Sequence, residues 1–391
     1  MGDRTVVPRN LVPALLRSAS HYPVVTVSGP RQSGKTTLCR AIFPQLPYIS
    51  LERLDLRAAV REDPRGFLRD HPSGALIDEV QHVPEIVSYL QVEVDEDPTP
   101  GRFVLTGSRH FGLVEGISQS LAGRTAVHSL LPLSLDEVAR FRAPPTDLMT
   151  ALWTGSYPRI HDQAIPPGEW LSDYVTTYVQ RDVRQILNVG DLEAYETFVR
   201  LAAGRAAREI NLSAIGSDAG VSHNTARSWL SILQTAFLCF RAPVWRTSVR
   251  KRVVRAHRLH FFDSGLVCNL LGIDSPDQLR RHPLRGQIFE TWVASEIYKA
   301  RAHAGERPGI YHYREVTGLE IDVLAETSRG LAAVEAKSGA TVGGDFFRNL
   351  ERFSSISPDA RLAMVYGGDE RMRRRDVDVL GWRDIHAFDW V

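Results

Sequence analysis

The chain contains 391 residues, of which 43% are apolar and 24% charged, and its formal net charge is +1. These values are typical of a globular protein with two or three domains, and three widely spaced cysteines exclude a disulfide framework and a zinc site and indicate a reducing cytoplasmic environment. No run of 18 apolar residues and no apolar leader occur, so we expect neither a membrane span nor a signal peptide.

Short strands and helices alternate through the first third of the chain. Residues 24–28, 74–78 and 102–106 are β-branched or apolar runs typical of buried strands, and helix-like segments lie between them. Such an alternation predicts an α/β domain with a parallel sheet. We expect this domain to occupy residues 1–145 and to end at the proline-rich segment 143–147.

The segment after the first strand matches the phosphate-binding pattern G-x-x-x-x-G-K-[ST]. Its glycines allow backbone N–H groups to surround phosphates, and the helix that follows adds partial positive charge. Lys35 is expected to bind the β- and γ-phosphates, and the Thr36 hydroxyl to ligate magnesium. Only four of 47 basic residues are lysine, which indicates that position 35 needs a compact ammonium. We therefore predict that ATP and Mg²⁺ bind at Gly29, Pro30, Arg31, Gln32, Ser33, Gly34, Lys35, Thr36 and Thr37.

Polar residues that follow the later strands complete the predicted nucleotide site. Asp78 is expected to hold magnesium through water and Glu79 to orient the attacking water, with a helix cap as the alternative. Residues 106–108 offer polar side chains that sense the γ-phosphate, or form a simple turn. Arg124 is a candidate arginine finger toward the γ-phosphate, from its own subunit or from a neighbour in a homo-oligomer; the alternative is a solvated surface arginine.

The middle of the chain carries helical periodicity and a helix-turn-helix pattern at residues 212–235. We expect a turn at Gly220, a helix cap at Ser222 and a helical and winged-helix domain over residues 146–265. The second helix should bury Ala226, Trp229, Leu230 and Leu233. Its outward face should then present His223, Asn224, Arg227 and Ser228.

A basic segment follows this pattern and is a candidate wing. Residues 240–262 contain seven basic residues and no acidic one. Basic side chains there suit contacts with phosphates, so we expect nucleic acid as a partner and no membrane. The alternative is a module that binds proteins or serves as a lid.

The C-terminal residues return to a strand pattern and place acidic residues on two of the strands. Asp322 and Glu335-Ala336-Lys337 are similar to the PD-(D/E)XK nuclease core, although no Pro-Asp pair precedes the first acid. Glu290 matches a carboxylate often found on the preceding helix of that fold. The similarity implies that Glu290, Asp322 and Glu335 bind Mg²⁺ and that Lys337 helps to activate water. The alternative is two exposed strand carboxylates with a lysine in a salt bridge. We expect this restriction-endonuclease-like α/β domain to occupy residues 266–391.

The motifs together resemble a family of prokaryotic AAA-type ATPases that carry a C-terminal domain named DUF4143. The resemblance rests on GPRQSGKTTL, LIDEVQHVPE, VLTGSRHF and SLAGR, and on later segments such as YVQRDVRQI, LHFFDSGL, FETWVASEI and EIDVLAE. It implies an ATPase joined to a winged-helix module and a nuclease-like domain. We therefore predict a magnesium-dependent ATPase that acts on nucleic acid, with metal-dependent nuclease activity as a further hypothesis. The alternative is an ATP-dependent regulatory switch whose other domains only bind protein or DNA partners.

Overall fold

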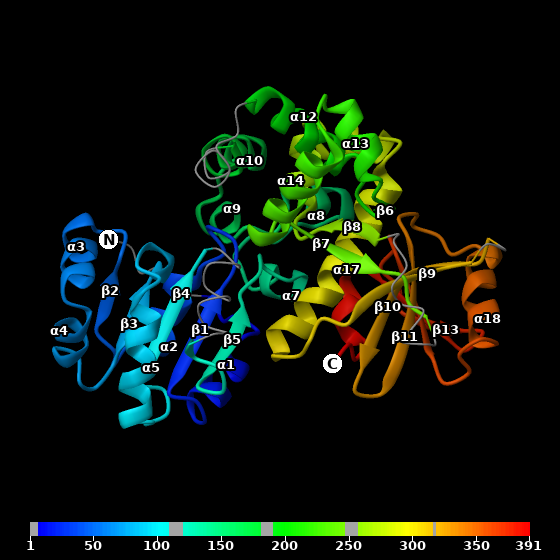
Figure 1. The fold of residues 1–391 in the computed structure, drawn as a ribbon. Helices are drawn as coiled ribbons and strands as arrows, with labels where there is room; N and C mark the ends of the chain where they lie inside the picture. The colour runs from blue at the N-terminus through cyan, green and yellow to red at the C-terminus, as the bar shows by residue number, and fades with distance from the viewer. Residues whose placement is uncertain (1–6, 109–119, 181–190, 247–256, 316–317) are drawn as a thin grey trace. The chain divides into compact units, whose positions relative to one another are not determined.

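The computed structural model describes residues 7–108, 120–180, 191–246, 257–315 and 318–391. The chain divides into two compact units (Figure 1). The N-terminal unit contains residues 1–132, 235–237 and 302–306. The C-terminal unit contains residues 133–234, 238–301 and 307–391.

A parallel sheet of five strands forms the centre of the N-terminal unit. Its strand order is β2-β3-β4-β1-β5, and every neighbouring pair is parallel. The three inner strands β3, β4 and β1 are buried along their whole length, whereas the edge strands β2 and β5 are partly exposed. The strands are β1 (Val24–Ser28), β2 (Tyr48–Ser50), β3 (Ala75–Asp78), β4 (Phe103–Gly107) and β5 (Thr125–Ser129).

Helices cover both faces of this sheet. Alternate residues of the strands point to opposite faces, so that Val24 and Val25 belong to two different cores. One core includes apolar residues of α3 (Leu54–Glu62), α4 (Pro64–Arg69) and α5 (Ile86–Glu96). The other includes residues of α1 (Val12–Ala19) and α2 (Lys35–Ile42). The predicted parallel α/β domain is therefore confirmed.

The C-terminal unit begins with a group of short helices. Aromatic rings of Tyr157, Trp170, Tyr174 and Tyr178 pack on one another at centroid distances of 4.7 to 5.1 Å. These contacts join α10 to the segments on either side of it. The helical elements are α7 (Leu135–Val138), α8 (Leu148–Thr154), α9 (Pro158–Gln163), α10 (Pro167–Tyr174), η2 (Val175–Gln180), α15 (Ser264–Leu270) and α16 (Pro276–Arg281).

A winged helix follows in the same unit. Three helices and a three-stranded sheet of order β6-β8-β7 make up this module, and β8 is antiparallel to both neighbours. The helix-turn-helix turn contains Gly220 at φ +72°, where a side chain is rarely tolerated. The elements are α12 (Leu192–Ala203), β6 (Arg208–Glu209), α13 (Leu212–Asp218), α14 (His223–Thr235), β7 (Cys239–Pro243) and β8 (His257–Phe261).

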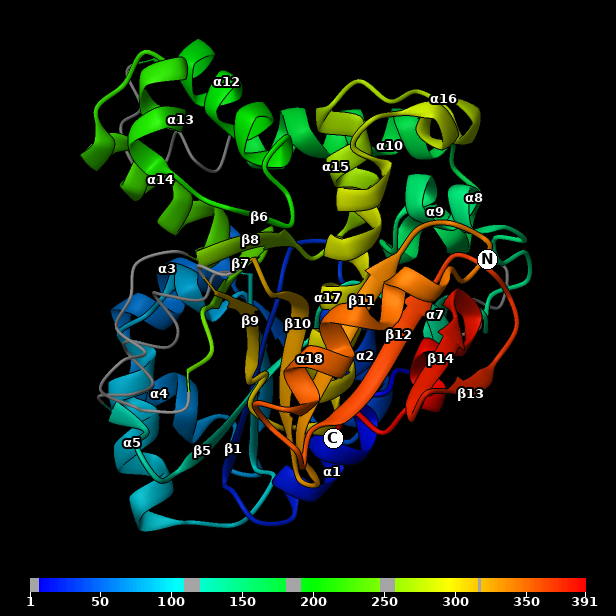
Figure 2. The same ribbon diagram turned by 90° about the vertical axis from the view of Figure 1, so that its right-hand side faces the viewer.

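A six-stranded mixed sheet ends the chain, preceded by the 20-residue helix α17 (Arg285–Ala304). The strand order is β13-β14-β12-β11-β10-β9, and α18 (Arg348–Ser354) packs over β10 and β11 (Figure 2). The order α17, β9, β10, β11, α18, β12 is that of the restriction-endonuclease-like fold predicted here. The strands are β9 (Ile310–Arg314), β10 (Glu320–Thr327), β11 (Gly330–Lys337), β12 (Arg361–Tyr366), β13 (Met372–Arg374) and β14 (Val377–Gly381), with η4 (Gly344–Phe347) and η5 (Trp382–Ala387) beside them.

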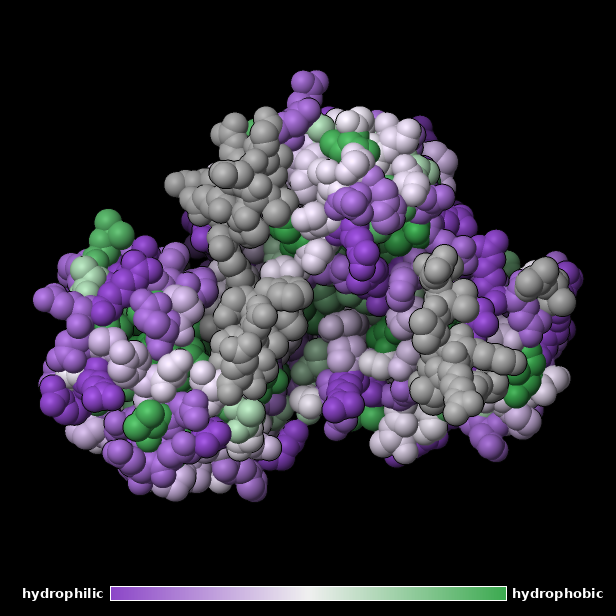
Figure 3. Space-filling view, in the orientation of Figure 1, coloured by the Kyte–Doolittle hydropathy of each residue, from purple (hydrophilic) through white to green (hydrophobic). Residues whose placement is uncertain are grey.

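Among the described residues, the large apolar side chains that are exposed include Leu16, Leu54 and Val92. The face in Figure 3 is mainly hydrophilic, with hydrophobic residues scattered across it. In the part of the chain that the structure describes, no helix combines the length and the apolar character needed to cross a membrane.

Candidate functional site

The loop between β1 and α2 has the backbone that phosphate binding requires. Gly29, Gln32 and Gly34 have φ angles of +151°, +63° and +93°. A Cβ atom at Gly29 would lie 2.2 Å from the carbonyl oxygen of Leu130, so only glycine fits there. The loop reaches the N-terminus of α2 at the carboxyl edge of the parallel sheet, the edge where α/β proteins bind ligands.

Lys35 is folded back over the loop that it follows. Its Nζ atom donates to the carbonyl oxygens of Gly29 at 2.9 Å and Pro30 at 2.8 Å. Burial lowers the pKa of Lys35 to about 8, although the charges of Glu79 and Asp78 raise it. The ammonium therefore occupies a carbonyl-lined position from which it can turn to a triphosphate.

Asp78, the last residue of β3, accepts hydrogen bonds from three hydroxyl groups. Thr36 Oγ1 lies 3.2 Å from Oδ1 and 3.0 Å from Oδ2, and Tyr48 donates to Oδ2 at 2.8 Å. Thr106 donates to Oδ1. The predicted magnesium ligands Thr36 and Asp78 therefore lie together at the edge of the sheet.

Glu79 follows in the left-handed conformation, with φ +56°. Its Oε2 atom accepts hydrogen bonds from Gln81 and, at 3.2 Å, from Ser108. The predicted γ-phosphate sensors thus contact carboxylates, since Thr106 binds Asp78 and Ser108 binds Glu79. The two acids are held differently, which agrees with two separate roles.

Three residues of this site were missed in the sequence. Arg9 is buried, and its guanidinium donates to the carbonyl oxygens of Ser33 and Leu131 at 2.8 Å each. Arg9 and Tyr48 are far from the motifs in sequence, so no spacing indicates them. Gln81 lies two residues after Glu79, and that spacing was a usable signal.

Arg124 lies at the other edge of the sheet. Its carbonyl oxygen accepts from Val24 N at 3.3 Å, at the start of β1, whereas the phosphate-binding loop follows the end of β1. Its Nη2 atom lies 2.9 Å from Asp95 Oδ2. The structure therefore does not support an arginine finger acting within the same subunit, and a finger supplied to a neighbouring subunit stays a prediction.

The recognition helix α14 has the predicted faces. Ser222 Oγ accepts from the Thr225 backbone N–H at 3.1 Å and caps the helix. The expected inward side chains of Ala226, Trp229, Leu230 and Leu233 are buried, and those of His223, Asn224, Arg227 and Ser228 are exposed. The basic residues Arg250, Lys251 and Arg252 of the expected wing lie outside the described residues.

The C-terminal sheet brings Asp322, Glu335 and Lys337 together. Lys337 Nζ lies 2.6 Å from Glu335 Oε2 and 3.7 Å from Asp322 Oδ2. Burial and the charge of Asp322 raise the pKa of Glu290 on α17 and of Glu335, each to about 8. Glu290 therefore shares the electrostatic environment of the other two carboxylates.

Cationic side chains and a backbone N–H group lie against two of these carboxylates. Within residues 7–391, gaps in the description excepted, no group of three His, Cys, Asp or Glu side chains is arranged to hold a metal ion. Lys337 lies between Glu335 and Asp322, and Arg258 from β8 lies 3.5 Å from Asp322 Oδ1. Asp322 Oδ2 also accepts from the Ala336 backbone N–H at 3.0 Å. Protein donors thus lie against Asp322 and against one oxygen of Glu335, whereas Glu335 Oε1 is buried with no hydrogen-bond partner among the described residues. Metal binding by Glu290, Asp322 and Glu335 therefore stays a prediction.

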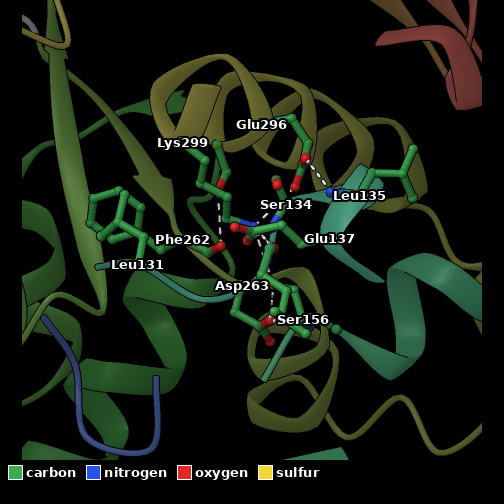
Figure 4. Close-up of polar contacts among 12 residues, drawn as sticks. Leu131, Ser134, Leu135, Glu137, Ser156, Phe262, Asp263, Glu296 and Lys299 are labelled. Carbon is green, nitrogen blue, oxygen red and sulfur yellow. Dashed lines mark hydrogen bonds and ion pairs between the residues drawn. The ribbon is translucent and has the colours of Figure 1, made fainter. Parts of the chain in front are cut away.

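A second buried lysine belongs to a structural network (Figure 4). Lys299 Nζ donates to Glu296 Oε1 at 2.9 Å, to the Leu133 carbonyl oxygen at 2.9 Å and to Ser156 Oγ at 3.1 Å. Burial would raise the pKa of Glu296, but Lys299 and His386 lower it to about 2. Each polar group is matched, so this network stabilises the fold of the C-terminal unit.

Comparison with known sequence families divides the chain into three parts. Residues 21–139 match the AAA domain, and residues 145–277 match a domain of unknown function, DUF8612. Residues 285–385 match a second domain of unknown function, DUF4143. The first match covers the phosphate-binding loop, Asp78 and Glu79, and the third covers Glu290, Asp322 and Glu335.

Similar whole chains are found in mycobacteria. Uncharacterized proteins of Mycobacterium bovis and Mycobacterium tuberculosis are each 29% identical over 377 residues, which cover 96% of this chain and 83% of theirs. Among solved structures, a Walker-type ATPase of Pyrococcus abyssi is 14% identical with a TM-score of 0.47, covering 68% of this chain and 96% of that one. The RuvB Holliday junction branch migration motor of Thermotoga maritima is 19% identical with a TM-score of 0.29, covering 60% of this chain and 87% of that one.

Proposed function

We propose that this chain, which is an AAA-type P-loop ATPase with a C-terminal DUF4143 domain, binds ATP with magnesium and hydrolyses it. The observation that carries the proposal is the meeting of four residues at one edge of the parallel sheet. Lys35 and Thr36 begin α2, Asp78 ends β3, and Glu79 follows it. Phosphate, metal and water sites are all needed for phosphoryl transfer, and these residues supply them.

The residues fit a magnesium ion by their chemistry. A hydroxyl and a carboxylate are oxygen donors of the kind that Mg²⁺ prefers, and Thr36 and Asp78 already lie within 3.2 Å of each other. Bound there, the ion would neutralise charge on the phosphates. Lys35 would leave the Gly29 and Pro30 carbonyl oxygens to bind the β- and γ-phosphates.

Glu79 is the residue proposed to act on water. As the water oxygen bonds to the γ-phosphorus, the bond from that phosphorus to the β–γ bridging oxygen breaks and its electron pair leaves with ADP. Glu79 accepts one proton of the water and returns it to solvent. Glu79→Gln should keep ATP affinity within about twofold but slow hydrolysis by at least about 100-fold. Equal loss of binding and hydrolysis would instead assign Glu79 a structural role.

We propose nucleic acid as the partner of the C-terminal unit. The proposal is supported by the exposed face of α14 in the winged helix and by the basic composition of the sequence that follows β7. Nuclease activity at Asp322, Glu335 and Lys337 is a further hypothesis, in which Lys337 and the Ala336 backbone N–H group lie against the carboxylates and Glu335 Oε1 has no hydrogen-bond partner among the described residues.

Binding of duplex DNA at several salt concentrations tests this partner. We expect affinity to fall steeply with salt, and Arg250, Lys251 and Arg252 changed together to alanine should flatten the slope by about three ions. Arg200→Ala on α12, an exposed arginine outside the recognition helix, is the control. Salt-insensitive binding, or none, would favour a protein partner and the regulatory-switch alternative. Incubating the same DNA with Mg²⁺ or Mn²⁺ tests cleavage.

A further inference from the structure

The side chain of Gln81 is built into the carboxylate arrangement beside the phosphate-binding loop. Glu79 has a left-handed backbone, and the short helix η1 (Val80–His82) follows at once. This tight turn brings two side chains that are two residues apart to the same side. Gln81 Nε2 donates to Glu79 Oε2, and the strained conformation of Glu79 is typical of functional sites.

Ser108, which follows β4, completes a triangle with these two residues. Its hydroxyl donates to Glu79 Oε2 at 3.2 Å and accepts from Gln81 Nε2 at 3.1 Å. Ser108 is buried, so this hydrogen bond is held in place by the sheet. The ends of two neighbouring strands therefore fix one oxygen of the Glu79 carboxylate. Among the described residues, no hydrogen bond reaches the other oxygen, which is left to act on water.

A second observation points to an incomplete arrangement at Gln81. Its Oε1 atom is buried and has no hydrogen-bond partner among the described residues. The carboxylate beside it accepts only, so Nε2 must face Glu79 and Oε1 must face away. Buried amide oxygens are rarely left unpaired, and the exceptions are enriched at sites that a ligand or a water completes.

We propose that Gln81, together with Ser108, is a positioning residue that orients the Glu79 carboxylate for hydrolysis. The inference rests on the proposed ATPase function and deepens it. Gln81 acts through Glu79, so its loss should affect the rate of the chemical step and not the affinity for ATP. Phosphate binding depends on Lys35 and the loop backbone, which Gln81 does not contact by any hydrogen bond in the described chain.

Steady-state ATP hydrolysis and equilibrium ATP binding by Gln81→Ala test the proposal. We expect kcat to fall by about 10- to 100-fold while KM and the Kd for ATP change by less than about twofold. Gln81→Asn keeps the amide but shortens the chain and should recover little. Ser108→Ala should lower kcat as well, and the double variant should lose less than the product of the two single effects, because both act on one carboxylate.

The pH dependence of kcat in Gln81→Glu distinguishes a positioning role from a purely structural one, which would leave that pH dependence unchanged. A second carboxylate beside Glu79 disfavours ionisation of both, so the acidic limb of the kcat profile should shift to higher pH. A wild-type profile with unchanged kcat in Gln81→Ala would overturn the positioning role while leaving the ATPase intact. If the wild-type protein does not hydrolyse ATP, the proposed function itself fails. Loss of ATP binding in Gln81→Ala would also overturn the proposal, since it would show a role in the fold of the site.

Discussion

Thr36 Oγ1 donates to both carboxylate oxygens of Asp78, at 3.2 and 3.0 Å, across 42 residues of sequence. Thr36 lies in the first turn of α2 and Asp78 is the last residue of β3. Their contact therefore joins the phosphate-binding loop to the end of β3 in the proposed nucleotide site. Tyr48 and Thr106 donate to the same carboxylate and restrict its rotation. A magnesium ion could bind to both side chains, because each offers an oxygen ligand.

Removing the hydroxyl should therefore impair the use of magnesium. We expect Thr36→Ala to lower the hydrolysis rate by about 100-fold and to raise the Mg²⁺ concentration needed for half-maximal rate. The measurement is ATP hydrolysis over a magnesium titration. Thr99→Ala, which removes an exposed hydroxyl of the same unit, is the matched control and should behave as the wild type. An unchanged magnesium requirement would argue against Thr36 as a ligand.

The lowered pKa of Lys35 leads us to expect that the affinity for ATP depends on pH. Burial lowers its pKa to about 8 in the nucleotide-free protein, and the negative charge of a bound triphosphate must raise it. Affinity should therefore be constant below pH 8 and fall by up to about tenfold per pH unit above it, because binding then requires uptake of a proton. Calorimetric titration at pH 9 in two buffers of different ionisation enthalpy measures that uptake. A constant affinity from pH 7 to 9.5 would contradict this account.

Arg9 should support the phosphate-binding loop from beneath. Its two donors satisfy the carbonyl oxygens of Ser33 and Leu131, so Arg9→Met should destabilise the fold by about 2–3 kcal/mol and weaken ATP binding. Arg9→Lys should recover little, since one ammonium cannot reproduce the planar pair of donors. Denaturant unfolding and ATP binding are the measurements. Arg53→Ala removes an exposed ion pair and should leave the stability nearly unchanged. Equal losses of stability in the Arg9 and Arg53 variants would contradict a specific role of Arg9 in supporting the loop.

The raised pKa of Glu290 leads us to expect that the stability of the C-terminal unit depends on pH. Its folded pKa of about 8 exceeds the ordinary value of 4.5, so the folded state binds the extra proton between these values. The stabilisation is complete below pH 4.5 and is lost as pH rises through about 8. Glu290→Gln should therefore stabilise the protein by about 1–3 kcal/mol at pH 9 and change little at pH 5.

Denaturant unfolding at the two pH values measures this difference. Glu370→Gln, an exposed carboxylate in the same unit, is the control and should show no such change with pH. A destabilised Glu290→Gln variant at pH 9 would show instead that the carboxylate is charged in the folded state and bound to a cation.

Local patterns in the sequence were sufficient for the loop and the fold, because both depend on short-range spacing. Glycines and Lys35 mark the loop, and the alternation of strand residues places Glu335 and Lys337 on one face. The role of Arg258 could not be predicted, since it depends on how β8 lies beside β10. That contact, with the position of Lys337, places protein donors against Asp322 and one oxygen of Glu335.

The residues that support the nucleotide site were equally beyond reach of the sequence. Arg9 and Leu131 are separated by 122 residues, and Tyr48 and Asp78 by 30. The position of Arg124 at the edge of the sheet opposite to the phosphate-binding loop could not be predicted either. It depends on the parallel pairing of β5 with β1. Such contacts arise from tertiary packing and leave no periodic signal.

ATP hydrolysis by the purified 391-residue chain is the measurement that tests the central claim most directly. We expect magnesium-dependent release of phosphate from ATP, abolished by a chelator and by Lys35→Ala, since the other lysines lie outside the loop. Lys35→Ala should also bind ATP more weakly while unfolding at a similar temperature. A Lys35→Ala variant that hydrolyses ATP at the wild-type rate would contradict the assignment of this loop as the nucleotide site.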